Sequence, residues 1–178
     1  MLEQFLDFVA TVGLAIWSVL TLDTSISGWF REHPLNTEMA MTIAALAGAS
    51  TLLGDSVVLF LNQVRGWRFT VSLVLNGLGF LLLYALQALV IALVGPLLTG
   101  HTPGFGTVLR GVLLSTAPMV FGFLVLIPYF GPVIARLLQA WGVVILWMVN
   151  IALFGGPFSA LLIIAIAWGV MQMLSWSL

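Results

Sequence analysis

The last quarter of the chain contains no charged side chain. Every residue from 137 to 178 is uncharged, and this run is about twice the ~20 residues that one α-helix needs to cross the hydrocarbon core of a bilayer. An ionised side chain is costly in hydrocarbon, so the charges of a membrane protein collect at the ends of its spans. Charged residues make up 6% of this sequence, against about 25% in soluble domains. We therefore expect an integral membrane protein.

Charged residues, prolines and glycines divide the sequence into five apolar runs. Pro118 lies inside the third run and should kink it, because proline removes one backbone hydrogen bond. The sequence PYFGP, at residues 128 to 132, predicts a tight turn, and Gly155-Gly156-Pro157 splits the long uncharged run in two. Short loops force neighbouring helices to run antiparallel, so we expect an all-α integral membrane fold with five transmembrane helices in one bundle. The runs lie between Glu38 and Arg65, from Arg68 to near Gly95-Pro96, from about Thr107 to Ile127, and twice after Arg136.

Residues 1 to 22 follow a different pattern. Apolar side chains recur there at helical spacing, while Glu3, Asp7, Thr11 and Ser18 fall elsewhere on the helix. This pattern favours an amphipathic interfacial helix that precedes the bundle over the alternative, a sixth span. Most interfacial helices present Lys and Arg to anionic lipid, and this one carries acids, so we expect it to dock on protein, such as the bundle itself. Residues 1–36 would thus form the interfacial helix and a connecting loop, and residues 37–178 the transmembrane domain. The apolar positions are Leu2, Phe5, Leu6, Val9, Val12, Ile16 and Val19.

The first two spans each carry a stripe of small and polar side chains on one face. Small residues let helix backbones approach closely enough for polar side chains to bond between helices. If the chain turns near residues 65 and 66, Asp55 and Asn76 lie equally far from the turn, and we expect them to touch. The stripes consist of Ala44, Gly48, Thr51, Asp55 and Asn62 in the first span and of Ser72, Asn76, Gly79 and Gln87 in the second.

Asp55 has two interpretations that the sequence leaves open. In the functional one, this carboxylate belongs to a proton or cation relay, or to a polar site that binds a partner. In the structural one, it belongs to a buried polar cluster that fixes the register of the helices. Both interpretations use the same set of residues, which we call the polar seam: Thr51, Asp55, Asn62, Asn76 and Gln87.

The composition argues against several classes of function. There is no Cys to form a disulfide, a thiolate nucleophile or a Cys-ligated metal site, and a net charge of -1 gives no basic patch for nucleic acid. Asp55 is the one carboxylate inside an expected span, so the paired acids of an intramembrane protease are missing, and His33 and His101 lie in loops far apart. No HExxH or GxSxG motif occurs. We therefore expect no enzyme activity, no metal and no cofactor, although a bound lipid is compatible with the bundle.

The second half of the chain resembles a known family. TVLRGVLLSTAPMVFGFLVLIPYFGPVIARLLQAWGVVILW is similar to the core of the Yip domain family, multi-span membrane proteins of the Rab-GTPase-interacting type. GGPFSALLIIAIAWGVMQML resembles the final span of that family, and LAGASTLLGDSVVLFLNQV resembles the first span of its bacterial members. The resemblance implies a five-span bundle after a membrane-associated segment. It also implies a structural role for the motif positions Ala117, Pro118, Pro128 and Gly131.

The resemblance implies less about activity. Eukaryotic members bind prenylated small GTPases and take part in vesicle formation and membrane shaping. Their long soluble amino-terminal region has no counterpart in this sequence, so GTPase binding is not carried over to it.

Two functions follow as expectations. The first is a non-enzymatic membrane scaffold or interaction protein that contacts lipid and other membrane proteins, for example as an accessory subunit or assembly factor of a complex in a bacterial inner membrane or a thylakoid membrane. The alternative is a small transporter or channel whose path is lined by Asp55, Asn76 and Gln87. A water-filled cavity that reaches Asp55 would favour transport, whereas a dry seam would favour a scaffold.

Overall fold

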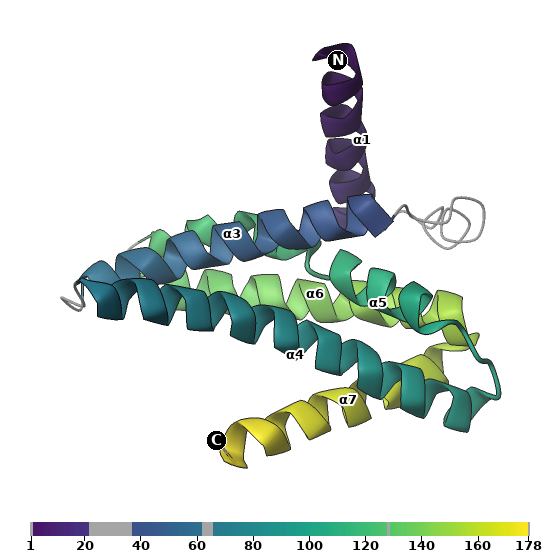
Figure 1. The fold of residues 1–178 in the computed structure, drawn as a ribbon. Helices are drawn as coiled ribbons and strands as arrows, with labels where there is room; N and C mark the ends of the chain where they lie inside the picture. The colour runs from purple at the N-terminus through teal and green to yellow at the C-terminus, as the bar shows by residue number, and fades with distance from the viewer. Residues whose placement is uncertain (1, 22–36, 62–65, 128, 178) are drawn as a thin grey trace.

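The computed structural model describes residues 2–21, 37–61, 66–127 and 129–177. These residues form helices and turns and no strand, which confirms the expected all-α fold. Figure 1 shows most of the helices running side by side along one long axis, with α1 standing apart from them. The elements are α1 (Leu2–Leu20), α3 (Thr37–Leu61), α4 (Trp67–Thr99), α5 (Phe105–Leu114), the 3₁₀ helix η1 (Ala117–Leu126), α6 (Gly131–Phe154) and α7 (Pro157–Ser177).

Three helical segments of the described chain are long and apolar enough to cross a membrane. They are α4, the combined segment Phe105–Leu126, and α6. Shorter apolar stretches, Val9–Leu20 and Pro157–Val170, lie in α1 and α7. Large apolar side chains such as Leu82 and Leu161 remain exposed on the outer faces, where a soluble protein would place polar groups. The chain is accordingly a membrane protein with several apolar helices.

Both glycine-containing turns occur where the sequence predicts them. The backbone N–H of Gly131 donates to the carbonyl of Ile127 over 3.0 Å, which closes the turn between η1 and α6. Gly155 and Gly156 have φ angles of 74° and 140°, so the break between α6 and α7 uses backbone conformations that favour glycine. Pro128, in the first turn, lies outside the described residues.

The second span ends later than predicted. α4 continues through Pro96 to Thr99, and Gly100 ends it with a φ of 72° and an N–H bonded to the carbonyl of Pro96. A proline within a membrane helix is tolerated when neighbouring groups satisfy the backbone around it. A left-handed glycine therefore sets the helix end here, and the proline does not.

The third span changes helix type, whereas the sequence predicts only a kink. It is α-helical up to Leu114 and becomes a 3₁₀ helix from Ala117 to Leu126, with Pro118 in the first turn of that helix. The ring of Pro118 would clash with the carbonyl four residues earlier, so an α-helix cannot continue regularly. Ser115 and Thr116 donate their hydroxyls to the carbonyls of Val112 and Leu113, three residues back. These local bonds favour a tighter turn than the α-helix has.

α3 packs more extensively on η1 than on α4. The Ser50 hydroxyl accepts a hydrogen bond of 2.9 Å from the backbone N–H of Phe123. Gly122 faces Thr51 so closely that a side chain there would lie 3.3 Å from the threonine hydroxyl. The small residues of the first span therefore hold the 3₁₀ helix, a partner that the expected pairing of the first two spans did not include.

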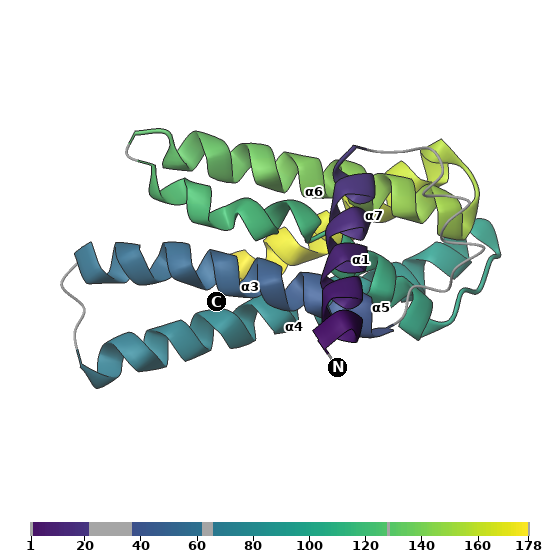
Figure 2. The same cartoon turned by 90° about the horizontal axis from the view of Figure 1, so that it is seen from above.

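α1 docks on the bundle through its second half. Its buried residues Val12, Ala15 and Val19 form one core cluster with Ile43 of α3, Leu114 and Ala117 of the third span, and Ile145 and Val149 of α6. The Trp141 indole donates to the carbonyl of Leu20 over 3.2 Å. Figures 1 and 2 both show α1 running at a steep angle to α3, α4 and α6. The first half of α1 extends beyond the bundle, where Leu6 and Val9 are exposed.

Candidate functional site

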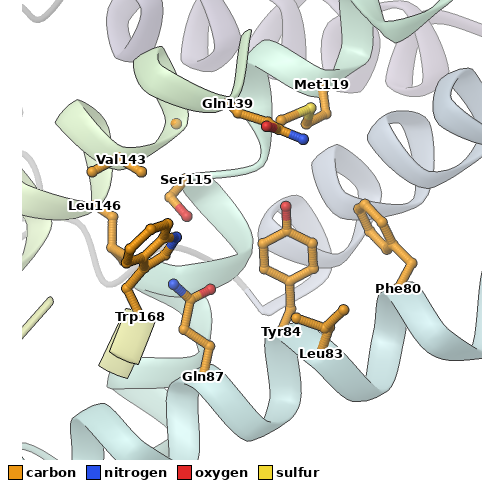
Figure 3. A pocket seen from close by; sticks show the side chains of 11 residues that line it. Phe80, Leu83, Tyr84, Gln87, Ser115, Met119, Gln139, Val143, Leu146 and Trp168 are labelled. Atoms are coloured by element: carbon orange, nitrogen blue, oxygen red, sulfur yellow. The ribbon is translucent and has the colours of Figure 1, made fainter. Parts of the chain in front are cut away.

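A cavity of about 440 Å³ opens where the break in the third span meets α4, α6 and α7. α4 forms one wall, the junction of α5 and η1 a second, and α6 and α7 the rest (Figure 3). The α6 backbone approaches the break closely, because a side chain at Gly142 would lie 3.1 Å from the carbonyl of Ser115. The lining residues are Phe80, Leu83, Tyr84, Gln87, Ser115, Met119, Gln139, Gly142, Val143, Leu146 and Trp168.

The cavity has a mostly apolar lining with a few polar side chains, none of which carries a charge. Gln87 and Gln139 enter from opposite walls, and the hydroxyl of Tyr84 points into the space between them (Figure 3). Trp168 stands beside Gln87, while Phe80 and Tyr84 pack together with ring centroids 4.6 Å apart. None of the lining residues is ionised at neutral pH. The cavity can therefore hold a neutral molecule that forms hydrogen bonds, or water.

A second space, which we call the gap, lies between α3 and α4. It measures about 390 Å³, and Thr51 and Asn76 face it from opposite helices. It shares Phe80 and Leu83 with the cavity, so these two side chains separate the two spaces. The other lining residues of the gap are Gly48, Leu52 and Gly79.

The structure divides the polar seam between these two spaces. Thr51 and Asn76 line the gap, whereas Gln87 lines the cavity. The Thr51 hydroxyl donates to the carbonyl of Ala47 over 2.9 Å, within its own helix. The side chain of Asp55 and the whole of Asn62 lie outside the described part of the chain, so the expected contact of Asp55 with Asn76 stays a prediction.

Comparison of the chain with protein-family models, curated proteins and solved structures found no match. The resemblance to the Yip domain family thus stays a prediction. Of its motif positions, Ala117, Pro118 and Gly131 are buried, and Pro128 is outside the described residues.

Several residues of the site were missed by sequence reasoning. Tyr84 and Trp168 resemble the other aromatic residues of the spans, and Gln139 lies in the expected fourth span but was not singled out. Outside the cavity, Asn150 of α6 was missed as well: it is 1% exposed, its amide N–H donates to the carbonyl of Leu146, and its Oδ1 has no partner within the described chain. Single polar residues in otherwise apolar spans are the signal that would have found Gln139 and Asn150.

The expectation of no metal site concerned His33 and His101. No group of three or more His, Asp or Glu side chains suited to a metal occurs among the described residues. His101 is exposed in the loop after α4, and its Nδ1 lies 3.2 Å from the carbonyl of Thr99. His33 lies outside the described residues.

α1 offers a second candidate surface. At 100° per residue its side chains fall on three faces, one of which packs on the bundle. The second face carries Glu3 and Asp7, both exposed, and the third carries the exposed apolar residues Leu6, Val9 and Trp17. A helix with three such faces can contact protein, water and acyl chains at the same time.

Proposed function

We propose that this chain is a non-enzymatic integral membrane protein that recruits or holds another membrane protein through α1. Five spans, namely α3, α4, the α5 and η1 segment, α6 and α7, would cross the bilayer. α1 would then run nearly in the membrane plane, because it lies at a steep angle to α3, α4 and α6 (Figure 2). An accessory or assembly role in a bacterial inner membrane or a thylakoid membrane is consistent with this arrangement.

The observation that carries the proposal is the projecting first half of α1. Leu6 and Val9 are 56% and 49% exposed, and no described part of the bundle covers them. Acyl chains can cover such residues at an interface, but Glu3 and Asp7 would face anionic headgroups without a cation on the same helix. A protein that presents Arg or Lys at the membrane surface complements both the acids and the apolar face.

Site-specific photocrosslinking in the native membrane tests this proposal. A benzoylphenylalanine at Ala10, which is exposed one turn after Leu6 and Asp7, is expected to give one defined adduct with another protein. The adduct should fall at least severalfold when Glu3 and Asp7 are both changed to Lys, because like charges then meet. The same crosslinker at Leu82, exposed on α4, serves as the control. Lipid adducts alone at Ala10, or a protein adduct that survives the charge reversal, would contradict the proposal.

A transporter or channel is the second candidate, and one observation favours it. The cavity lies at the break in a span and adjoins the gap through Phe80 and Leu83, and solute sites in transporters are built at such interrupted helices. In sealed proteoliposomes this candidate predicts ion or proton flux that falls at least tenfold in Asp55→Asn. On the scaffold proposal there is no flux, and Asp55→Asn changes stability or assembly only.

A further inference from the structure

A third space adjoins the cavity and differs from it in chemistry. This groove, of about 260 Å³, lies between α6 and α7, and the described residues that line it are all apolar. It shares Val143 and Trp168 with the cavity, so the polar groups of the cavity adjoin the apolar groove across these two side chains. Trp168 and Leu161 are 58% and 53% exposed, which leaves the groove open toward the outer face of the bundle.

Three polar side chains of the cavity have no hydrogen-bond partner in the part of the chain that the structure describes, whereas the Ser115 hydroxyl donates to the carbonyl of Val112. None of the hydrogen bonds found among the described residues uses the side chains of Tyr84, Gln87 or Gln139. Gln139 is exposed, but Tyr84 and Gln87 are partly buried, and inside a membrane such groups are costly unless an occupant bonds to them. The two amide groups and the phenol each offer an N–H or O–H donor, so they suit an acceptor such as a carbonyl oxygen.

The residues that line the cavity also restrict which chemical group can bind there. Among the described residues no cationic side chain lines the cavity, so a phosphate or carboxylate there would have no counter-charge from them. Phe80, Tyr84 and Trp168 flank the two glutamines and give a flat ring apolar surfaces to stack on (Figure 3). The groove beyond Trp168 is apolar and has a volume of about 260 Å³, which suits a hydrocarbon chain.

We propose that the cavity and the groove together bind one neutral lipid with a carbonyl-bearing ring and a single apolar chain, the chemistry of a prenylated quinone. The ring lies between Tyr84 and Trp168 and accepts hydrogen bonds from Gln87 and Gln139. The chain leaves past Val143 into the groove between Trp147 and Ile164. This site is separate from the α1 surface and does not depend on the role proposed for α1.

Quenching of tryptophan fluorescence by decylubiquinone, with the full chain in mild detergent, tests this site. We expect saturable quenching that Gln87→Met weakens about tenfold, the usual effect of losing one buried hydrogen bond. Ala165→Trp fills the groove and should weaken binding of the decyl compound while leaving binding of a quinone without the chain unchanged. Leu82→Met, on the outer face of α4, is the matched control and should bind normally.

Competition on the unmodified protein keeps the test decisive if a variant fails to fold. Decanol and dioctanoylglycerol have comparable chains but lack the ring, so either should relieve the quenching by decylubiquinone only at concentrations at least tenfold above that of the quinone. Equal displacement by either compound would mean a general lipid groove and would overturn the proposal. Quenching that does not saturate, or that is the same in Gln87→Met, would overturn it as well.

Discussion

Gly131→Ala is expected to lower the free energy of unfolding by about 3 kcal/mol, the upper part of the range for overpacking. A Cβ at this position would lie 2.2 Å from the backbone carbonyl oxygen of Val125, far inside van der Waals contact. The turn from Ile127 to Gly131 folds the end of η1 back onto the start of α6, and backbone atoms on both sides leave no flexible side chain to move. The thermal unfolding midpoint in mild detergent, followed by circular dichroism, measures the loss.

Gly106→Ala is the matched control for this change. Gly106 also lies in the first turn of a helix, but nothing comes within 4 Å of an added Cβ. Its substitution should leave the midpoint unchanged or raise it slightly, since alanine restricts the unfolded chain. An equal effect of the two substitutions would show that the clash at Val125 is not what makes glycine necessary at position 131.

Gly95→Ala is expected to lower the free energy of unfolding by about 2 kcal/mol, because the added Cβ would clash with a side chain of another helix. Two ring carbons of Phe154 lie 2.2 Å from the position of the new Cβ, and Phe154 is 1% exposed. The ring is packed in one core cluster with Ile91 and Ile163, so it cannot turn away without disturbing α4 and α7. Gly95 is therefore the point where α4 makes room for the end of α6.

A double-mutant cycle separates this contact from a general intolerance of substitution in α4. In a Phe154→Leu background the ring is gone, and Gly95→Ala should cost at least 1 kcal/mol less than it does in the unmodified chain, within the coupling range for touching residues. The comparison again uses unfolding midpoints in mild detergent. Strict additivity of the two substitutions would contradict a direct contact between Gly95 and Phe154.

The positions of the helices could largely be predicted from the sequence, because they depend on local chemistry. Ionised side chains stay out of hydrocarbon, and the glycines at 155 and 156 favour backbone angles that other residues rarely adopt. The change to a 3₁₀ helix after Thr116 was not predicted, since it needs the Ser115 and Thr116 hydroxyls to bond three residues back. Pro118 alone indicates only a kink.

The candidate site was much less predictable, because it depends on which helices meet. A polar stripe indicates which face of a helix turns toward protein, but it does not name the partner, and α3 packs chiefly on η1. The cavity combines Gln87, Gln139 and Trp168 from three helices far apart in the sequence. No local pattern links such residues, so Gln87 was found through its stripe and the other two were missed.

The amphipathic pattern of residues 1 to 22 predicted the burial of some apolar residues of α1 and not of others. Val12 and Val19 of the predicted apolar stripe do pack on the bundle, whereas Leu6 and Val9 of the same stripe are exposed. The difference arises because α1 crosses the bundle at a steep angle, so only its second half reaches α3 and α6 (Figure 1). Periodicity predicts the face of a helix that is buried but not the length over which a partner covers it.

The most direct test of the proposed role of α1 is to identify which proteins remain bound to the chain after its extraction from the native membrane. Native mass spectrometry in mild detergent should find another protein bound in fixed stoichiometry, and the charge reversal of Glu3 and Asp7 to Lys should remove it while the chain stays folded. A chain that is recovered alone or only with copies of itself would contradict the role as an interaction protein.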